Sequence, residues 1–307
     1  IRDSPVLAGR GIPRSESMIT GSIVALVTPM HPDGAIDWAA MATLIEYHIE
    51  SGTAAICVVG TTGESPTLTV PEHCELIRFA VEQSGGRIPV VAGTGGNSTH
   101  EAIELTVAAA EAGADYSLSV TPYYNKPTQD GMFQHFQAVA RAVNLPIILY
   151  NVPGRTGCDL LNDTVIKLSQ NDTIVAVKDA TGDVARGAEL ISAVPDGFAV
   201  FSGDDATALE LMRHGGQGNI SVTANIAAPD MAAMCDAAFA GDWEAATAID
   251  ARLADLNHLL FAESNPIPIK WAMAFRGMIS EGIRLPLTPL SSGHHAALQR
   301  ALEAYFA

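Results

Sequence analysis

Lys178 is the residue whose type and position point most directly to a chemical role. It follows the apolar run 174–177, so its amine is expected in a partly dry pocket at the end of a buried strand. Desolvation disfavours the charged ammonium, and a neutral amine can attack a carbonyl carbon and form a Schiff base. The alternative is a lysine that reaches solvent and pairs with Asp179 or Glu64.

Tyr150 ends another apolar run, residues 146–150, one predicted strand earlier. A Schiff-base mechanism needs a group that moves protons onto and off the carbinolamine, and a phenol within hydrogen-bond reach can do so. A hydroxyl chain with Thr61 and Tyr124 would support this role. A tyrosine at a strand end can instead pack its ring and tether its hydroxyl, so its combination with Lys178 is what favours catalysis.

Two further loops carry groups that suit carboxylates. Residues 61–64, Thr-Thr-Gly-Glu, offer hydroxyls and backbone N–H groups in a turn that glycine permits. Arg155 lies in the loop 151–157, which contains glycine and proline, and a guanidinium there can bind a carboxylate through two parallel hydrogen bonds. A threonine-capped turn and a surface arginine are the alternatives.

Residue spacing argues against a metal site. Asp204 and Asp205 are adjacent, but they follow Ser-Gly and begin a predicted helix, so helix capping is the preferred interpretation. The nine histidines form no set such as H-E-x-x-H. The four cysteines lie far apart without a C-x-x-C pair, which indicates a reducing, cytoplasmic compartment.

Eight short apolar runs place these residues at their ends. The runs are continuous and rich in β-branched residues, as in parallel strands buried on both faces. They repeat every 20 to 33 residues, roughly, which predicts an α/β fold, a closed (β/α)8 TIM barrel over residues 18–226. An open doubly wound sheet is the alternative, but its dinucleotide fingerprint is lacking. The runs are residues 22–27, 54–59, 88–92, 116–120, 146–150, 174–177, 198–201 and 219–222.

Helical patterns fill the connections and the C-terminal end. Thr69 and Ser98 each begin a capping box, with glutamate three residues later. After residue 226 no strand pattern follows, so residues 227–307 are predicted to form a C-terminal α-helical domain. Residues 1–17 lack the apolar segment of a secretory signal, and we expect a disordered or added extension. The other predicted helices are residues 36–49, 128–143, 163–168, 183–194, 204–214, 229–262, 265–281 and 292–306.

The net charge limits the classes of partner. The 307 residues include 17 Lys+Arg and 34 Asp+Glu, a formal charge of -17. This charge repels nucleic acid and anionic lipid surfaces, and we expect neither as a partner. The apolar runs are all too short to span a membrane. We therefore expect small-molecule substrates or other protein surfaces as partners.

The strand-end motifs occur in an order that is known from one family. They are Gly60-Thr-Thr-Gly-Glu64, Tyr123-Tyr-Asn-Lys-Pro127, Tyr150-Asn-Val-Pro-Gly-Arg155-Thr-Gly157, Val177-Lys-Asp-Ala-Thr-Gly182, Ser202-Gly-Asp-Asp205 and Ser221-Val-Thr-Ala-Asn225. In register from about Met18 to the C-terminus, the chain resembles the dihydrodipicolinate (4-hydroxy-tetrahydrodipicolinate) synthases. The resemblance implies a β/α barrel with a C-terminal helical domain, usually in a homotetramer built as a dimer of dimers.

The resemblance also implies catalytic roles. Lys178 would form the Schiff base with pyruvate. Tyr150 would be the proton-transfer phenol, joined to Thr61 and to Tyr124 of the neighbouring subunit. The enamine of pyruvate would attack L-aspartate 4-semialdehyde, and cyclisation by the substrate amine would free Lys178. The implied pathway is lysine and diaminopimelate biosynthesis, with no metal or organic cofactor.

Four further residues would bind the substrates if the resemblance holds. Thr62 would help to hold the carboxylate of pyruvate, and Arg155 would bind that of the semialdehyde. Gly203 and the carbonyl of Ile220 would line the pocket. N-acetylneuraminate lyases and 2-keto-3-deoxy-sugar-acid aldolases or dehydratases share the lysine, but Arg155, Tyr124 and the double threonine favour the synthase. A third hypothesis is a non-catalytic barrel that binds keto acids.

Feedback inhibition by lysine is less strongly implied. Regulated members of the family would bind the effector at positions that include His73, Asn97, Glu101 and Tyr123, all of which fit here, together with Ser65. Val70 stands where many sensitive enzymes have histidine, and Pro66 is also atypical. We therefore predict that lysine binds weakly or not at all.

Overall fold

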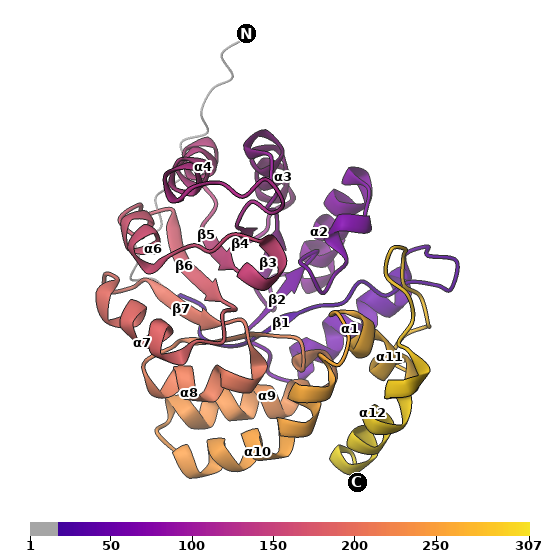
Figure 1. Cartoon of the computed structure of the whole chain (residues 1–307). Coiled ribbons are helices and arrows are strands. Elements are labelled where there is room, and N and C mark those ends of the chain that lie inside the picture. Colours follow the sequence, from indigo (N-terminus) through magenta and orange to yellow (C-terminus); the bar gives the residue numbers. More distant parts are fainter. Residues whose placement is uncertain (1–17) are drawn as a thin grey trace.

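The apolar runs predicted as strands form a closed eight-stranded barrel in the computed structural model, which describes residues 18–307 (Figure 1). Each strand pairs in parallel with the next, and β8 closes the barrel against β1. The predicted strands are confirmed to within two residues at either end. The predicted extension, residues 1–17, lies outside the described residues. The strands are β1 Gly21–Ala25, β2 Ala55–Val58, β3 Val90–Gly93, β4 Tyr116–Val120, β5 Ile147–Asn151, β6 Ile174–Asp179, β7 Ala199–Ser202 and β8 Gly218–Ser221.

Side chains from all eight strands form an apolar cluster inside the barrel. β5 contributes Ile148 and Tyr150 to this cluster, and β6 contributes Ala176. Residues two apart in a strand point to the same face, so Lys178 also points inward. Because all strands run in the same direction, their C-terminal ends share one rim. The strand register pairs Tyr150 with Lys178 at this rim.

Helices surround the barrel, and two of them begin at the predicted capping residues. The Thr69 side chain accepts the backbone N–H of Glu72, and the Glu72 side chain accepts the N–H of Thr69, which completes a capping box. The Ser98 side chain accepts the N–H of Glu101 at 3.5 Å, which is one of the two hydrogen bonds of the predicted capping box. The helices that match predictions here are α1 Trp38–Glu50, α2 Val70–Ser84, α3 Thr99–Ala112, α4 Gln129–Ala142, α6 Asn162–Leu168 and α7 Val184–Ala193.

The predicted helix 204–214 is wrong in its first turn. Residues Asp205–Thr207 form the 3-10 turn η2, and the α-helix α8 runs only over Ala208–Arg213. Asp204 makes no side-chain capping bond, because its carboxylate accepts the hydroxyl of Thr207 at 2.7 Å instead. Two short rim elements that no pattern predicted are η1 Ser65–Thr67 and α5 Pro153–Thr156.

The predicted helix 229–262 is also wrong, because it is divided into two helices. α9 spans Ala224–Phe239 and α10 spans Trp243–Leu259. Gly241 separates them with φ +77, a value that favours glycine, and the Asp242 side chain caps α10. α10 has 17 residues. Across residues 18–307 no helix combines the length and the apolar character that crossing a membrane requires.

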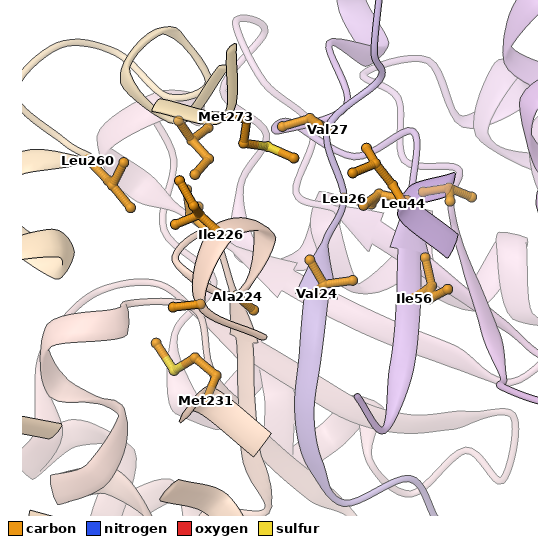
Figure 2. Packing of buried hydrophobic residues seen from close by; sticks show 14 of the residues in the cluster. Val24, Leu26, Val27, Leu44, Ile56, Ala224, Ile226, Met231, Leu260 and Met273 are labelled. Carbon is orange, nitrogen blue, oxygen red and sulfur yellow. The ribbon is translucent and has the colours of Figure 1, made fainter. Parts of the chain in front are cut away.

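The C-terminal helices pack against the first strand and helix of the barrel. The predicted helices 265–281 and 292–306 correspond to α11 Ile267–Phe275 and α12 Ser292–Tyr305, which lie on the α1 side of the barrel (Figure 1). The predicted end of the first of these helices is wrong, because α11 ends at Phe275, shortly before Gly277 with φ +70. The predicted boundary between residues 226 and 227 falls inside α9, at its kink. One buried cluster therefore joins barrel and C-terminal helices. Figure 2 labels ten of its members: Val24, Leu26, Val27, Leu44, Ile56, Ala224, Ile226, Met231, Leu260 and Met273.

Candidate active site

Lys178 lies near the end of β6 with its side chain inside the rim, and it is only 6% exposed. Its Nζ lies 4.5 Å from the centre of the Tyr150 ring. The alternative interpretation, an ion pair with Asp179 or Glu64, does not hold within residues 18–307. Asp179 accepts a backbone N–H of its own loop, and Glu64 pairs with Lys270. The amine of Lys178 therefore lies beside a phenol and not beside a carboxylate partner.

The barrel interior leaves little spare room around the Lys178 side chain. A Cβ atom added at Gly203 would lie 2.7 Å from the Cβ of Ala180 and 2.9 Å from the Cε of Lys178. Cys57 on β2 lies near enough for the Lys178 charge to influence its thiol, although burial dominates and raises the thiol pKa to about 11. Ile220 is buried in the same interior cluster. The predicted residue Gly203 therefore lies against the Lys178 side chain, and Ile220 is buried inside the same barrel.

A cavity of about 250 Å³ lies at the rim and has Tyr150 in its wall. This size suits small organic acids. The cavity brings together predicted residues that are far apart in the sequence, from β5 and from the loops after β2, β4 and β5. Six of these lining residues are Thr61, Ser65, Pro66, Tyr123, Tyr150 and Arg155.

Thr61 and Thr62 lie in a tight turn after β2. Glu64 closes the turn by donating its N–H to the carbonyl of Thr61 at 3.1 Å. A Cβ atom at Gly63 would lie 3.0 Å from backbone atoms of the preceding strand end, so only glycine fits there without a shift. Thr61 lines the cavity, whereas Thr62 is buried and its hydroxyl accepts the side-chain amide of Asn265 at 2.9 Å.

Arg155 lies on the one-turn helix α5 at the edge of the cavity. Its Nη2 donates to the backbone carbonyl of Asn265 at 3.1 Å, so the segment before α11 contacts both Arg155 and Thr62. The sequence prediction missed Asn265. Its partners are 110 and 203 positions away, and no local motif marks such contacts.

Among the predicted catalytic residues, Thr61 and Tyr150 line the cavity, Lys178 is not among its lining residues, and neither is Tyr124. Tyr124 is 87% exposed, and its backbone has φ +74, a value that is uncommon for residues other than glycine. Its backbone N–H donates to the carbonyl of Thr156 at 3.2 Å, which holds the loop next to α5. Within one chain, the predicted hydroxyl chain from Tyr150 to Tyr124 is not formed among the described residues.

The predicted lysine effector residues lie partly at the same cavity. Ser65, Pro66 and Tyr123 line it. The side-chain amide of Asn97 donates to the carbonyl of Tyr123 at 3.2 Å. Burial raises the pKa of the Tyr123 phenol, and the nearby Glu101 carboxylate adds to this effect.

The other two effector positions differ in their surroundings. His73 is buried on α2, and its Nε2 donates to the carbonyl of Gly93 at 2.7 Å. Burial lowers the pKa of His73, although this hydrogen bond and the charge of Glu101 oppose the effect. Val70 is exposed at the start of the same helix. His73 therefore has one ring nitrogen already engaged by the backbone.

Asp205 has a structural role that the sequence prediction missed. Its buried carboxylate accepts the N–H groups of Val222 at 2.9 Å and Thr223 at 3.0 Å, which holds the turn after β8. Burial raises its pKa, and these hydrogen bonds oppose the effect. Within residues 18–307 there is no cluster of three or more His, Cys, Asp or Glu side chains that could hold a metal ion.

Nearly the whole described chain matches one known family. A family model described as the dihydrodipicolinate synthetase family matches residues 18–305. The chain belongs to this family. Two family members named 4-hydroxy-tetrahydrodipicolinate synthase are close in sequence. The one from Nitrosomonas eutropha is 60% identical over 93% of this chain and 98% of its own length. The one from Nitrosospira multiformis is 58% identical over 92% of this chain and 95% of its own length.

A solved structure of the dihydrodipicolinate synthetase family has the same fold. It is the chloride-inhibited dihydrodipicolinate synthase from Acinetobacter baumannii complexed with pyruvate, which is 55% identical to this chain. The TM-score is 0.93, and the match covers 94% of this chain and 99% of that one. The predicted family and the barrel fold are therefore confirmed.

Proposed function

We propose that the protein condenses pyruvate with L-aspartate 4-semialdehyde through a Schiff base on Lys178, as a lyase of lysine and diaminopimelate biosynthesis. The observation that carries this proposal is the buried amine of Lys178 beside the Tyr150 ring at the barrel rim. Relatives that are 58% and 60% identical bear the name of this activity.

In the proposed reaction, the amine of Lys178 adds to the keto carbon of pyruvate, and water leaves from the carbinolamine. The phenol of Tyr150 moves protons onto and off this intermediate. Loss of a methyl proton gives an enamine, whose carbon attacks the aldehyde carbon of the second substrate. The amine of that substrate then adds to the iminium carbon, closes the ring and releases Lys178.

The two substrate carboxylates are assigned to different loops. The turn that carries Thr61 and Thr62 offers hydroxyl and N–H groups for pyruvate, and the guanidinium of Arg155 suits the carboxylate of the semialdehyde. Gly203 and Ile220 line the space around the amine. The chain carries a net charge of -17, so these local donors must supply the attraction for anionic substrates.

We further propose a cytoplasmic homotetramer in which Tyr124 completes the site of a neighbouring subunit. The 87% exposure of Tyr124 in the single chain supports this assignment, because an exposed tyrosine can insert into a partner. Lysine is proposed to bind weakly or not at all, since Val70 supplies no hydrogen bond from its side chain. A titration that finds strong inhibition at low millimolar or micromolar lysine would contradict this.

Turnover assays test the proposed function against its alternatives. The protein should consume pyruvate and L-aspartate 4-semialdehyde together, and it should cleave neither N-acetylneuraminate nor 2-keto-3-deoxygluconate at a comparable rate. Faster cleavage of either sugar acid would favour an aldolase. Binding of pyruvate without any turnover would favour the non-catalytic barrel.

A further inference from the structure

A buried ion pair lies behind the turn that carries Thr61 and Thr62, and the proposed chemistry does not use it. It joins Glu64, whose side chain is 0% exposed, to Lys270 of α11, whose side chain is 5% exposed. The second carboxylate oxygen of Glu64 accepts the backbone N–H of Arg284 at 3.1 Å. A residue of the catalytic loop is therefore bonded to two separate segments of the C-terminal region.

The backbone of Glu64 adopts a conformation that would suit glycine better. Its φ of 57 and ψ of 34 lie in the left-handed region, which costs free energy for a residue with a side chain. Glu64 also closes the turn, because its N–H donates to Thr61 and its carbonyl accepts the N–H of Thr67 at 2.9 Å. The surrounding contacts must hold this residue in place, and those of its carboxylate include the ion pair with Lys270.

The pair is poorly explained by stability alone. Both charges lose their hydration, and replacing a buried ion pair by well-packed apolar side chains is often neutral or stabilising. Burial lowers the pKa of Lys270, although the charge of Glu64 opposes this. Apolar side chains would not form the directional hydrogen bonds by which the Glu64 carboxylate fixes one end of the turn relative to α11 and to Arg284.

The segment that carries Lys270 contacts the turn at a second point. Asn265, five residues earlier, donates its side-chain amide to the hydroxyl of Thr62. The turn is thus held from behind by Asn265 at Thr62 and by Lys270 at Glu64, while Thr61 lines the cavity. Because these two contacts hold the turn at Thr62 and at Glu64, they fix both its position and its orientation relative to α11.

We propose that Glu64 and Lys270 are positioning residues, which hold Thr61 and Thr62 in the geometry that binds the pyruvate carboxylate. Neither side chain lines the cavity, so the pair acts through the turn. The inference rests on the proposed function, in which pyruvate is the first substrate and Lys178 its attachment point.

Three variants test the inference by steady-state kinetics with each substrate varied in turn. Glu64→Gln keeps the size and shape of the side chain. Its amide has one acceptor oxygen, whereas the carboxylate of Glu64 uses one oxygen for Lys270 and the other for Arg284. The double variant Glu64→Leu with Lys270→Met replaces the pair by apolar side chains. Glu46→Gln is the matched control, because Glu46 forms an exposed ion pair with Arg87 at 2.6 Å.

Glu64→Gln and the double variant should both raise the KM for pyruvate by about tenfold or more, because a small misplacement of binding groups has effects of this size. The KM for the semialdehyde should change less, and Glu46→Gln should leave both values unchanged. The double variant should keep a melting temperature near that of the wild type. A purely structural role would not raise the KM for pyruvate while leaving the melting temperature unchanged.

Several results would overturn the inference. One is a double variant with normal melting temperature and normal KM for pyruvate. Another is a double variant that does not fold, since the pair would then serve stability. The proposed function is judged separately, by whether the wild-type enzyme forms a borohydride-reducible pyruvate adduct on Lys178. If the adduct forms and the variants bind pyruvate normally, only the inference fails.

Discussion

At the scale of single residues, the position of the Lys178 amine depends on the absence of a side chain at residue 203. The burial of Lys178 at a strand end could be predicted from the sequence, because the preceding residues are all apolar, whereas its inward direction follows from the position of Ala176 inside the barrel. The close approach of Gly203 to Lys178 could not be predicted from the sequence. Lys178 lies on β6 and Gly203 directly follows the neighbouring strand β7, and the register between these strands is set by the closed barrel. The family resemblance marked Gly203 only as a lining residue.

Gly203→Ala should therefore impair catalysis more than folding. The added methyl group would lie 2.7 Å from Ala180 and 2.9 Å from Lys178 unless these atoms move, so the amine is displaced. We expect kcat to fall by about 100-fold, as misplacement of a reacting group by about 1 Å can cause. Overpacking should lower the free energy of unfolding by about 1–3 kcal/mol.

Kinetics and thermal melting of this variant provide the test, with Gly293→Ala as the control. A Cβ atom at Gly293 would meet nothing within 4 Å, and this residue lies at the start of α12. Gly293→Ala should leave kcat unchanged. An unchanged kcat for Gly203→Ala would contradict the account of the space around Lys178.

At the scale of secondary structure, the strands and most helix starts were predictable, but the starts of α8 and α10 and some helix ends were not. Continuous apolar runs indicate buried parallel strands, and this signal is local to each run. The division between α9 and α10 was missed, although Gly241 and the capping residue Asp242 both mark it, because the apolar pattern continues across them. The contribution of Asn265 to the site had no local signal at all.

The capping residue at the start of α2 should contribute measurably to the free energy of unfolding. Thr69→Ala removes the hydroxyl that accepts the N–H of Glu72 at the start of α2, and it should lower the free energy of unfolding by about 1 kcal/mol. Denaturant unfolding measures this. Thr43→Ala is the control, since Thr43 is exposed within α1 and alanine suits a helix interior better. Equal destabilisation by both substitutions would contradict the capping role.

At the scale of the whole molecule, the C-terminal region is bonded to the barrel by charged groups as well as by the shared apolar core. Arg284 donates from Nη1 and Nη2 to the Glu72 carboxylate at 2.8 and 2.7 Å. This guanidinium is the main reason why the pKa of Glu72 is lowered to about 2. Pairs like this were not predictable, because the two residues lie 212 positions apart.

The Glu72–Arg284 pair should make part of the stability depend on pH. Since the folded-state pKa of Glu72 is below its ordinary value of 4.5, the contribution is fully present above pH 4.5 and is lost as the pH falls toward 2. Melting temperatures of the wild type and Glu72→Gln should differ at pH 7 and converge in this acidic window. A constant difference down to pH 2 would contradict the assignment.

The proposed oligomer makes a prediction about shared active sites. Lys178→Ala and Tyr124→Ala subunits should each be nearly inactive alone. When they are co-expressed, a mixed dimer has one site with Lys178 from one subunit and Tyr124 from the other, so about a quarter of wild-type activity should return. No recovery in mixed dimers would place Tyr124 in the site of its own chain, and full activity of Tyr124→Ala alone would place it outside catalysis.

The measurement that tests the central claim most directly is mass spectrometry of the protein after borohydride reduction in the presence of pyruvate. A Schiff base on Lys178 predicts one stable adduct per chain, located on the peptide that contains Lys178, and none in Lys178→Arg. Omitting pyruvate or borohydride should also abolish the adduct. An unmodified Lys178, or an adduct on another lysine, would contradict the account.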